Sequence, residues 1–259
     1  MQARIVPSTQ GARWLLDGWR LFRAAPVGWL ALVFAYWFLM TLVSLVPLAG
    51  IAAASVFVPA FSVGFMAAAR AASRGAPVEL SLLFEGFRNE RKAMLLLGLL
   101  YFACLALALG ASALVDGGAL AHWMLTGERP ADEALQSDAF LGALALAAAL
   151  YAPVMMAFWF APQLAAWHAI GAVKALFFSF FACLMNWRAF LAYGAATALV
   201  TLVFPFVMLT LLMLVFGGEE ARLPVMGLVF PLLLVILPTL FASFYASYRD
   251  VFGESSVAQ

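Results

Sequence analysis

The chain has 259 residues, of which 66% are apolar and only 10% are charged. Soluble globular domains are roughly 45–50% apolar and about 25% charged, so this composition excludes a soluble domain or a disordered segment. Fourteen Lys and Arg nearly balance thirteen Asp and Glu, which excludes a nucleic-acid binder because no basic surface is available to hold phosphates. The sequence therefore predicts one integral membrane domain over residues 1–259.

An amphipathic segment precedes the first long apolar stretch. Residues 12–23 place apolar side chains on one face of a helix and charged side chains on the opposite face. Such helices are typical of the membrane interface, where the apolar face enters the bilayer. We predict further interface helices over residues 79–91 and 173–186. The apolar face of the first helix consists of Trp14, Leu15, Gly18, Leu21 and Phe22.

Six apolar stretches are long enough to cross a bilayer, which takes about 20 residues. None contains a charged residue, and their apolar residues run continuously, which indicates helices and not the alternating pattern of an outer-membrane barrel. The sequence thus predicts an all-α, polytopic transmembrane bundle, with the first stretch kept as a span and not cleaved as a signal peptide. The predicted spans are residues 27–46, 48–69, 93–115, 139–167, 189–216 and 223–248.

The order of these elements repeats. Each interface helix is followed by two spans, and the second span of each pair carries a proline eleven or twelve residues before a basic residue. This spacing predicts three repeats of an interface helix plus a transmembrane hairpin. The alternative is that alanine-rich helices align with one another by chance. The three prolines are Pro59, Pro162 and Pro238.

The basic residues are distributed unevenly between the connections. Twelve of the fourteen fall on one side of the predicted membrane, and the loop from Asp116 to Asp138 on the other side is acidic, as is the turn with Glu219 and Glu220. By the positive-inside rule both termini, including the tail 249–259, are expected in the cytoplasm.

The spans carry no group suited to catalysis. Proton- or sodium-coupled pumps need buried carboxylates or histidines, and none lies in a span. His122 and His168 do not form a zinc motif, and no phosphate-binding loop or nucleophile motif occurs. Cys104 and Cys183 are expected at depths too different for a disulfide. We therefore predict no enzyme activity, no metal and no cofactor.

A polar cluster at the cytoplasmic ends of the spans is the candidate site. In a symmetric bundle these side chains would surround a vestibule that binds lipid headgroups or a partner. The alternative is that they extend to the headgroups and fix the depth of each helix. The candidate residues are Arg70, Gln163, His168, Lys174, Asn186, Arg188 and Arg249.

The N-terminal motif Gly11-x-x-Trp14-x-x-x-Gly18-Trp19-x-x-Phe22-x-x-x-Pro26-x-x-Trp29 resembles a family of uncharacterised bacterial membrane proteins. The stretches Ala161-Pro162-x-Leu164 and Ser179-Phe180, followed by Asn186-Trp187, are similar to later parts of that family. The resemblance implies a six-helix bundle in the bacterial inner membrane and no established activity. In layout the chain also looks, more distantly, like the membrane domain that accompanies some glycerophosphodiesterases.

Two functions fit these observations. The first is a non-enzymatic membrane protein that organises lipid or a membrane protein partner, including a second copy of itself, and that binds no nucleic acid. It follows from the interface helices, the basic ends of the spans and the absence of buried charge. The alternative is a passive channel or carrier for an apolar or zwitterionic solute, in which proline-kinked helices move.

Overall fold

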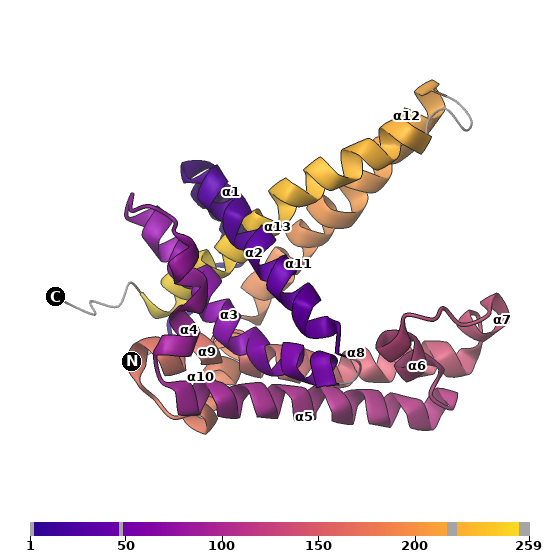
Figure 1. Cartoon of the computed structure of the whole chain (residues 1–259), viewed down its shortest axis with the longest axis horizontal. Helices are drawn as coiled ribbons and strands as arrows, with labels where there is room; N and C mark the ends of the chain where they lie inside the picture. The colour runs from indigo at the N-terminus through magenta and orange to yellow at the C-terminus, as the bar shows by residue number, and fades with distance from the viewer. Residues whose placement is uncertain (1–2, 47–48, 217–221, 254–259) are drawn as a thin grey trace. The chain divides into compact units, whose positions relative to one another are not determined.

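The computed structural model describes residues 3–46, 49–216 and 222–253, and all regular structure in these ranges is helical (Figure 1). Six helical segments are long and apolar enough to cross a membrane, which confirms the predicted all-α fold with six spans. The turn with Glu219 and Glu220 and residues 254–259 of the predicted tail lie outside the described ranges. The six segments are Pro26–Ser44, Ala49–Ser73, Arg91–Asp116, Asp138–His168, Trp187–Leu211 and Pro231–Phe252.

The helices follow one another with short connections (Figure 1). In chain order they are α1 (Ser8–Ala24), α2 (Pro26–Ser44), α3 (Ala49–Ser73), the 3-10 turn η1 (Leu80–Phe84), α4 (Glu85–Arg88), α5 (Arg91–Asp116), α6 (Ala119–Thr126), α7 (Asp132–Leu135), α8 (Asp138–Phe158), α9 (Ala161–His168), α10 (Ala172–Met185), α11 (Trp187–Ala198), the π-helical turn η2 (Leu199–Val203), α12 (Phe204–Phe216) and α13 (Arg222–Phe252).

The chain forms two compact units, and each is described by itself. The first consists of Met1–Tyr36, Gly64–Leu83 and Leu184–Gln259. The second consists of Trp37–Val63 and Phe84–Cys183. Helices α2 and α3 each contribute one part to each unit.

In the first unit, α1 packs between α11 and α13. Its apolar face is buried against protein, and Trp14 is fully enclosed. Two glycines allow the close approach: Gly11 lies against the backbone of Ala189 and Gly18 against the backbone of Thr239. The amphipathic pattern predicted a helix with its apolar face in the bilayer, whereas in the structure other helices cover that face.

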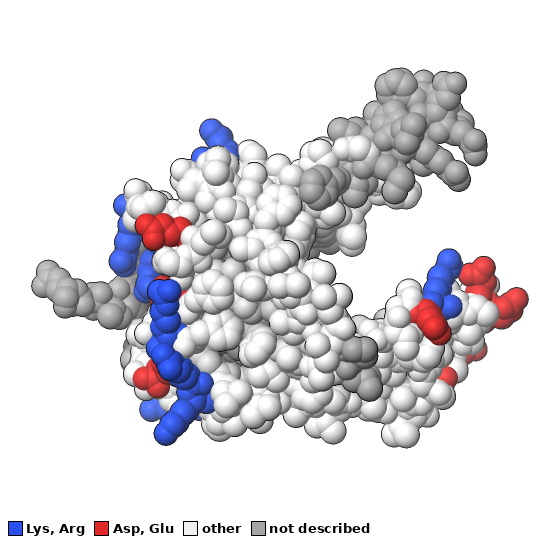
Figure 2. Space-filling view, viewed as in Figure 1, with Lys and Arg blue, Asp and Glu red and all other residues white. Residues whose placement is uncertain are grey.

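In the second unit, α5 and α8 pack along each other, and α6 covers one end of the pair. A small core of Leu120, Phe140 and Ala143 joins α6 to α8. Figure 2 shows mainly acidic side chains, with basic ones among them, over α6 and α7 at this end, mainly Lys and Arg at the opposite end of α5, and an uncharged belt between them on the visible face. This is the charge distribution expected of helices that span a bilayer.

The fourth span is broken between α8 and α9. The hydroxyl of Ser179 accepts a hydrogen bond from the backbone N–H of Phe160 at 2.9 Å and donates one to the backbone carbonyl of Met156 at 2.8 Å. It therefore stands between the two groups that an unbroken helix would pair directly. Pro162 has no N–H to offer and marks the start of α9. The side chain thus satisfies backbone groups that the membrane interior would leave without partners.

Two further segments differ in detail from the predicted helices. Residues 79–91 form η1 and the single turn α4, because Asn89 is extended and Glu90 takes the left-handed conformation (φ 46°), which ends the helix. In the fifth span, one π-helical turn precedes Pro205, which cannot donate a backbone hydrogen bond.

Candidate functional site

The predicted site residues fall into both units. Gln163, His168 and Lys174 belong to the second unit, and the other four belong to the first. A common vestibule formed by all seven therefore stays a prediction. The structure does show what several of these residues contact.

Asn186 holds the N-terminal segment in place. Its side chain is 2% exposed, its Oδ1 accepts from the backbone N–H of Val6 at 2.8 Å, and its Nδ2 donates to the carbonyl of Arg4 at 3.0 Å. Both sides of the amide are thereby used within the protein. These contacts give Asn186 a structural role at the junction of α10 and α11.

Arg249 lies in a network of charged and polar groups at the end of α13. It donates to Asp17 of α1 at 3.0 Å and to Asp250 at 3.2 Å. The carboxylate of Asp250 also accepts from Gln10 at 2.6 Å and from the indole nitrogen of Trp14 at 3.0 Å. The network ties α1 to α13, and two carboxylates offset the charge of Arg249.

Gln163 is 1% exposed at the start of α9. Its Nε2 donates to the hydroxyl of Ser62 at 3.2 Å, and that hydroxyl donates to the carbonyl of Pro59 at 2.7 Å. Its Oε1 has no hydrogen-bond partner among the described residues. The amide therefore joins α9 to α3 and leaves one buried acceptor unused.

The remaining predicted residues lie at helix ends. Arg70 is in the last turn of α3, and His168 ends α9. The ammonium of Lys174 lies 5.8 Å from the ring centre of Phe178, and the guanidinium of Arg188 lies 5.3 Å from that of Trp187. Such cation–π pairs are typical of basic side chains at a membrane interface.

Neither Cys104 nor Cys183 forms a disulfide in the structure. Cys183 is buried in α10, and this burial raises the pKa of its thiol, so the unreactive protonated form predominates at neutral pH. This supports the interpretation of Cys183 as a packing residue and not a nucleophile.

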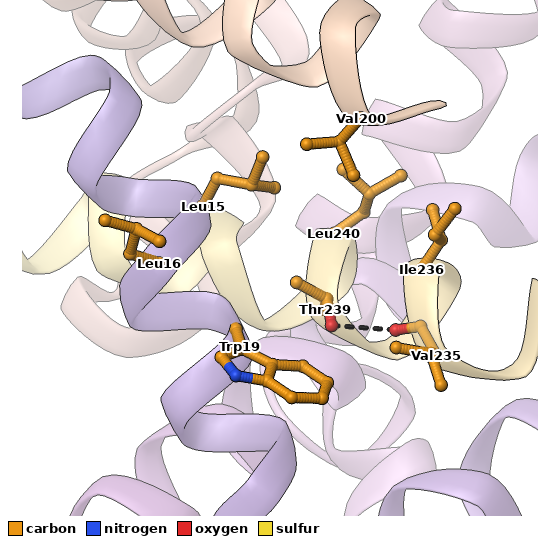
Figure 3. A pocket seen from close by; sticks show the side chains of 8 residues that line it. All are labelled: Leu15, Leu16, Trp19, Val200, Val235, Ile236, Thr239 and Leu240. Atoms are coloured by element: carbon orange, nitrogen blue, oxygen red, sulfur yellow. Dashed lines mark hydrogen bonds between the residues drawn. The ribbon is translucent and has the colours of Figure 1, made fainter. Parts of the chain in front are cut away.

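The first unit contains a groove that sequence reasoning did not identify. It lies between α1, η2 and α13 and has a volume of about 210 Å³. Figure 3 shows the three α1 side chains on one side, the α13 side chains on the other, and Val200 of η2 above them. The lining residues are Leu15, Leu16, Trp19, Val200, Val235, Ile236, Thr239 and Leu240.

The groove offers no free polar group to a ligand. Its one hydroxyl, on Thr239, donates to the carbonyl of Val235 in its own helix at 2.7 Å (Figure 3). The six-membered ring of Trp19 extends under Thr239, and its ring nitrogen lies on the side of α1. The guanidinium of Arg23, one turn further along α1, lies 5.9 Å from the centre of the Trp19 ring. An apolar groove thus ends near an aromatic side chain and a cation.

A second groove lies in the second unit, between α3, α4 and the start of α5. Its volume is about 240 Å³. Phe87 of α4 packs edge-to-face on two rings of α3: its ring centre lies 4.9 Å from that of Phe61 and 5.8 Å from that of Phe57. Arg91 lines the groove directly. The full lining is Val56, Phe57, Ala60, Gly86, Phe87, Arg91, Met94 and Leu95.

Comparisons with known proteins place the chain in a family. It is 42% identical to a protein of Burkholderia thailandensis described as a probable inner membrane protein, over 98% of this chain and 94% of the relative. No protein-family model and no solved structure matches the chain. None of these comparisons supports the more distant resemblance to the glycerophosphodiesterase-associated membrane domain. The chain therefore belongs to the family of this probable inner membrane protein, as a multi-pass member with six candidate spans.

Proposed function

We propose that this protein is a non-enzymatic membrane protein that organises lipid, and that the groove between α1, η2 and α13 holds a lipid acyl chain. The lining of the groove is the observation that carries this proposal: it is apolar, and its one hydroxyl is bonded within its own helix. A polar ligand would lose hydrogen bonds to water there without replacement, which costs several kcal/mol in an apolar setting. An acyl chain has no such groups to lose.

The apolar surface continues along α13. A neighbouring cavity of about 190 Å³ between η2, α12 and α13 shares Ile236 with the first groove. Its hydroxyl, on Thr201, donates to the carbonyl of Thr197 at 2.8 Å and is likewise satisfied within its helix. The two cavities together favour an elongated apolar occupant over a compact one.

Filling the groove is expected to remove bound lipid. Val235 lies at the rim and is 37% exposed, so Val235→Trp places an indole in the groove without disturbing the buried core. We expect native mass spectrometry of gently extracted protein to show lipid retained by the wild type and less by this variant, with lipid analysis of the same samples.

The matched control is Leu114→Trp on α5, which is 88% exposed and lines neither groove. It should retain as much lipid as the wild type. A wild-type protein extracted without lipid, or equal retention by Val235→Trp, would contradict the proposal. A second polypeptide in fixed ratio, lost in Val235→Trp, would instead assign the groove to a protein partner or a second copy.

A passive carrier is the second candidate, and the break in the fourth span favours it. The break places a buried amide with an unused acceptor beside Pro162. We expect a zwitterionic probe, glycine betaine, to enter proteoliposomes at a rate that Pro162→Ala changes, because alanine can restore the helix across the break. Pro153→Ala is the control, since α8 continues unbroken through Pro153. Entry at the rate of empty liposomes, or entry driven by a pH gradient, would exclude this candidate.

A further inference from the structure

The two grooves are built from the same sequence pattern. Leu15-Leu16-Asp17-Gly18-Trp19-Arg20-x-x-Arg23 at the first groove corresponds, residue by residue, to Leu83-Phe84-Glu85-Gly86-Phe87-Arg88-x-x-Arg91 at the second. Each copy has a leucine, an acid, a glycine, an aromatic residue and two arginines at the same spacing. The pattern is far more specific than the apolar stripe of the interface helices.

The helices opposite these motifs also correspond. Val235-Ile236-x-Pro238-Thr239 of α13 lines the first groove, and Val56-Phe57-x-Pro59-Ala60 of α3 lines the second. Three lining positions are shared by the two helices: three and two residues before the proline, and one residue after it. Leu240 lines the first groove in addition. The two grooves therefore share these three positions and the aromatic residue of the motif, Trp19 or Phe87.

The packing that forms the grooves is equivalent as well. Gly18 lies against the backbone carbonyl of Thr239, and Gly86 lies against the backbone carbonyl of Ala60. Each glycine thus meets the residue that follows the proline, and the aromatic residue after the glycine falls over the same part of the opposite helix. This shared packing supports the predicted repeat for two of its three copies. After the third predicted interface helix, the corresponding residues are Asn186-Trp187-Arg188. Asn186 replaces the glycine there, and its amide is used by the N-terminal segment.

The acidic residue of each motif forms its hydrogen bonds with other residues and not with the second arginine of its motif, Arg23 or Arg91. Asp17 accepts from Arg20 at 2.9 Å and from Arg249 at 3.0 Å, and Glu85 accepts from the indole nitrogen of Trp167 at 2.9 Å. Arg23 and Arg91 are exposed and make no ion pair with an acid in the part of the chain that the structure describes. Arg91 therefore lines the second groove, and Arg23 lies beside the aromatic residue of the first, each without an ion-pair partner among the described residues.

We infer that each groove binds one anionic phospholipid, with an acyl chain along the apolar lining and the phosphate at Arg23 or Arg91. This inference rests on the proposed function and adds the class of headgroup and the number of sites. A guanidinium binds phosphate through two parallel hydrogen bonds. An aromatic ring beside it suits the depth at which headgroups meet acyl chains. A basic residue near an anionic lipid surface strengthens binding about fivefold.

The test compares two lipids that share acyl chains and a phosphate but differ in headgroup, one with a net negative charge and one zwitterionic. Delipidated full-length protein in detergent is titrated with phosphatidylglycerol or phosphatidylcholine of identical acyl chains, and bound lipids are counted by native mass spectrometry. We expect two phosphatidylglycerol molecules to bind about fivefold more tightly than phosphatidylcholine. Arg23→Gln and Arg91→Gln should each abolish this preference at one site, and the double variant at both.

Arg20→Gln and Arg88→Gln are the matched controls, because they remove the same charge from the same segments. Both variants should still prefer phosphatidylglycerol at both sites. Circular dichroism checks that all variants are folded. Equal affinity for the two lipids, or an unchanged preference in the Arg23 and Arg91 variants, would overturn the inference.

Failure of the inference and failure of the proposed function give different results. Val235→Trp fills the first groove and Val56→Trp fills the second. Each variant should weaken the binding of both lipids equally at its own groove. If these variants lose lipid while the arginine variants do not, the grooves hold acyl chains without selecting a headgroup. If the tryptophan variants also bind lipid as the wild type does, the grooves are not lipid sites at all.

Discussion

Gly18→Ala is expected to lower the free energy of unfolding by about 1–3 kcal/mol. A Cβ atom at this position would meet the backbone carbonyl oxygen of Thr239 and the backbone nitrogen of Ser243 inside contact distance. Neither is a flexible side-chain end, so α1 must move away from α13. That displacement also strains the contacts between Asp17 and Arg249. Denaturant unfolding in detergent, followed by circular dichroism, measures the change.

The control for this prediction is Gly194→Ala in α11 of the same unit. Nothing lies within contact distance of a Cβ at Gly194, so alanine adds no clash there. Since alanine favours the helix more than glycine does, Gly194→Ala should raise the free energy of unfolding by up to about 1 kcal/mol. The same substitution is thus expected to lower the free energy of unfolding at Gly18 and to raise it at Gly194. A neutral or stabilising Gly18→Ala would show that α1 does not pack closely on α13.

Trp14→Ala is expected to destabilise the protein by about 3–5 kcal/mol. Trp14 is 0% exposed and packs against Phe190 and Tyr193, with ring centres 5.3 and 5.9 Å away. Its indole nitrogen also donates to Asp250. Removing the side chain leaves a cavity at the centre of the first unit and takes one donor from a partly buried carboxylate.

Trp14→Phe separates the two contributions, because it keeps much of the packing but loses the hydrogen bond. A loss of about 1.5–3 kcal/mol is expected for a bond to a charged group. Trp187→Ala is the control, since Trp187 is 51% exposed and its removal should change stability by about 0.5 kcal/mol or less. Equal effects of Trp14→Ala and Trp187→Ala in the same unfolding experiment would contradict the buried role of Trp14.

The pattern of apolar stretches in the sequence determines where the chain crosses the membrane. The ends of the first five predicted spans lie within five residues of the observed segments, as for 93–115 against Arg91–Asp116, whereas the sixth was predicted to begin at residue 223 and the observed segment begins at Pro231. This follows because a bilayer imposes a fixed length and an apolar composition, and both are local properties of the sequence. The break in the fourth span is different. Pro162 marks it in the sequence, but nothing local shows that Ser179 completes the hydrogen bonds there.

The candidate grooves could have been found from the sequence in part. The repeated spacing around Gly18 and Gly86, and around Pro238 and Pro59, is present in the chain itself. A comparison of apolar stripes does not detect it, because the informative positions are a glycine, an aromatic residue and an arginine. What these positions form could not be predicted, since each groove needs two helices that are distant in the sequence.

Sequence alone therefore determined the membrane class, the number of spans and the amphipathic nature of α1. Only the tertiary structure decided that the apolar face of α1 is covered by α11 and α13 and not by lipid. A helical pattern specifies which face is apolar but not what covers it. In the same way, the sequence shows Asn186 and Arg249 as polar residues near helix ends. Their partners, Val6 and Asp17, are so far away in the chain that only folding brings them together.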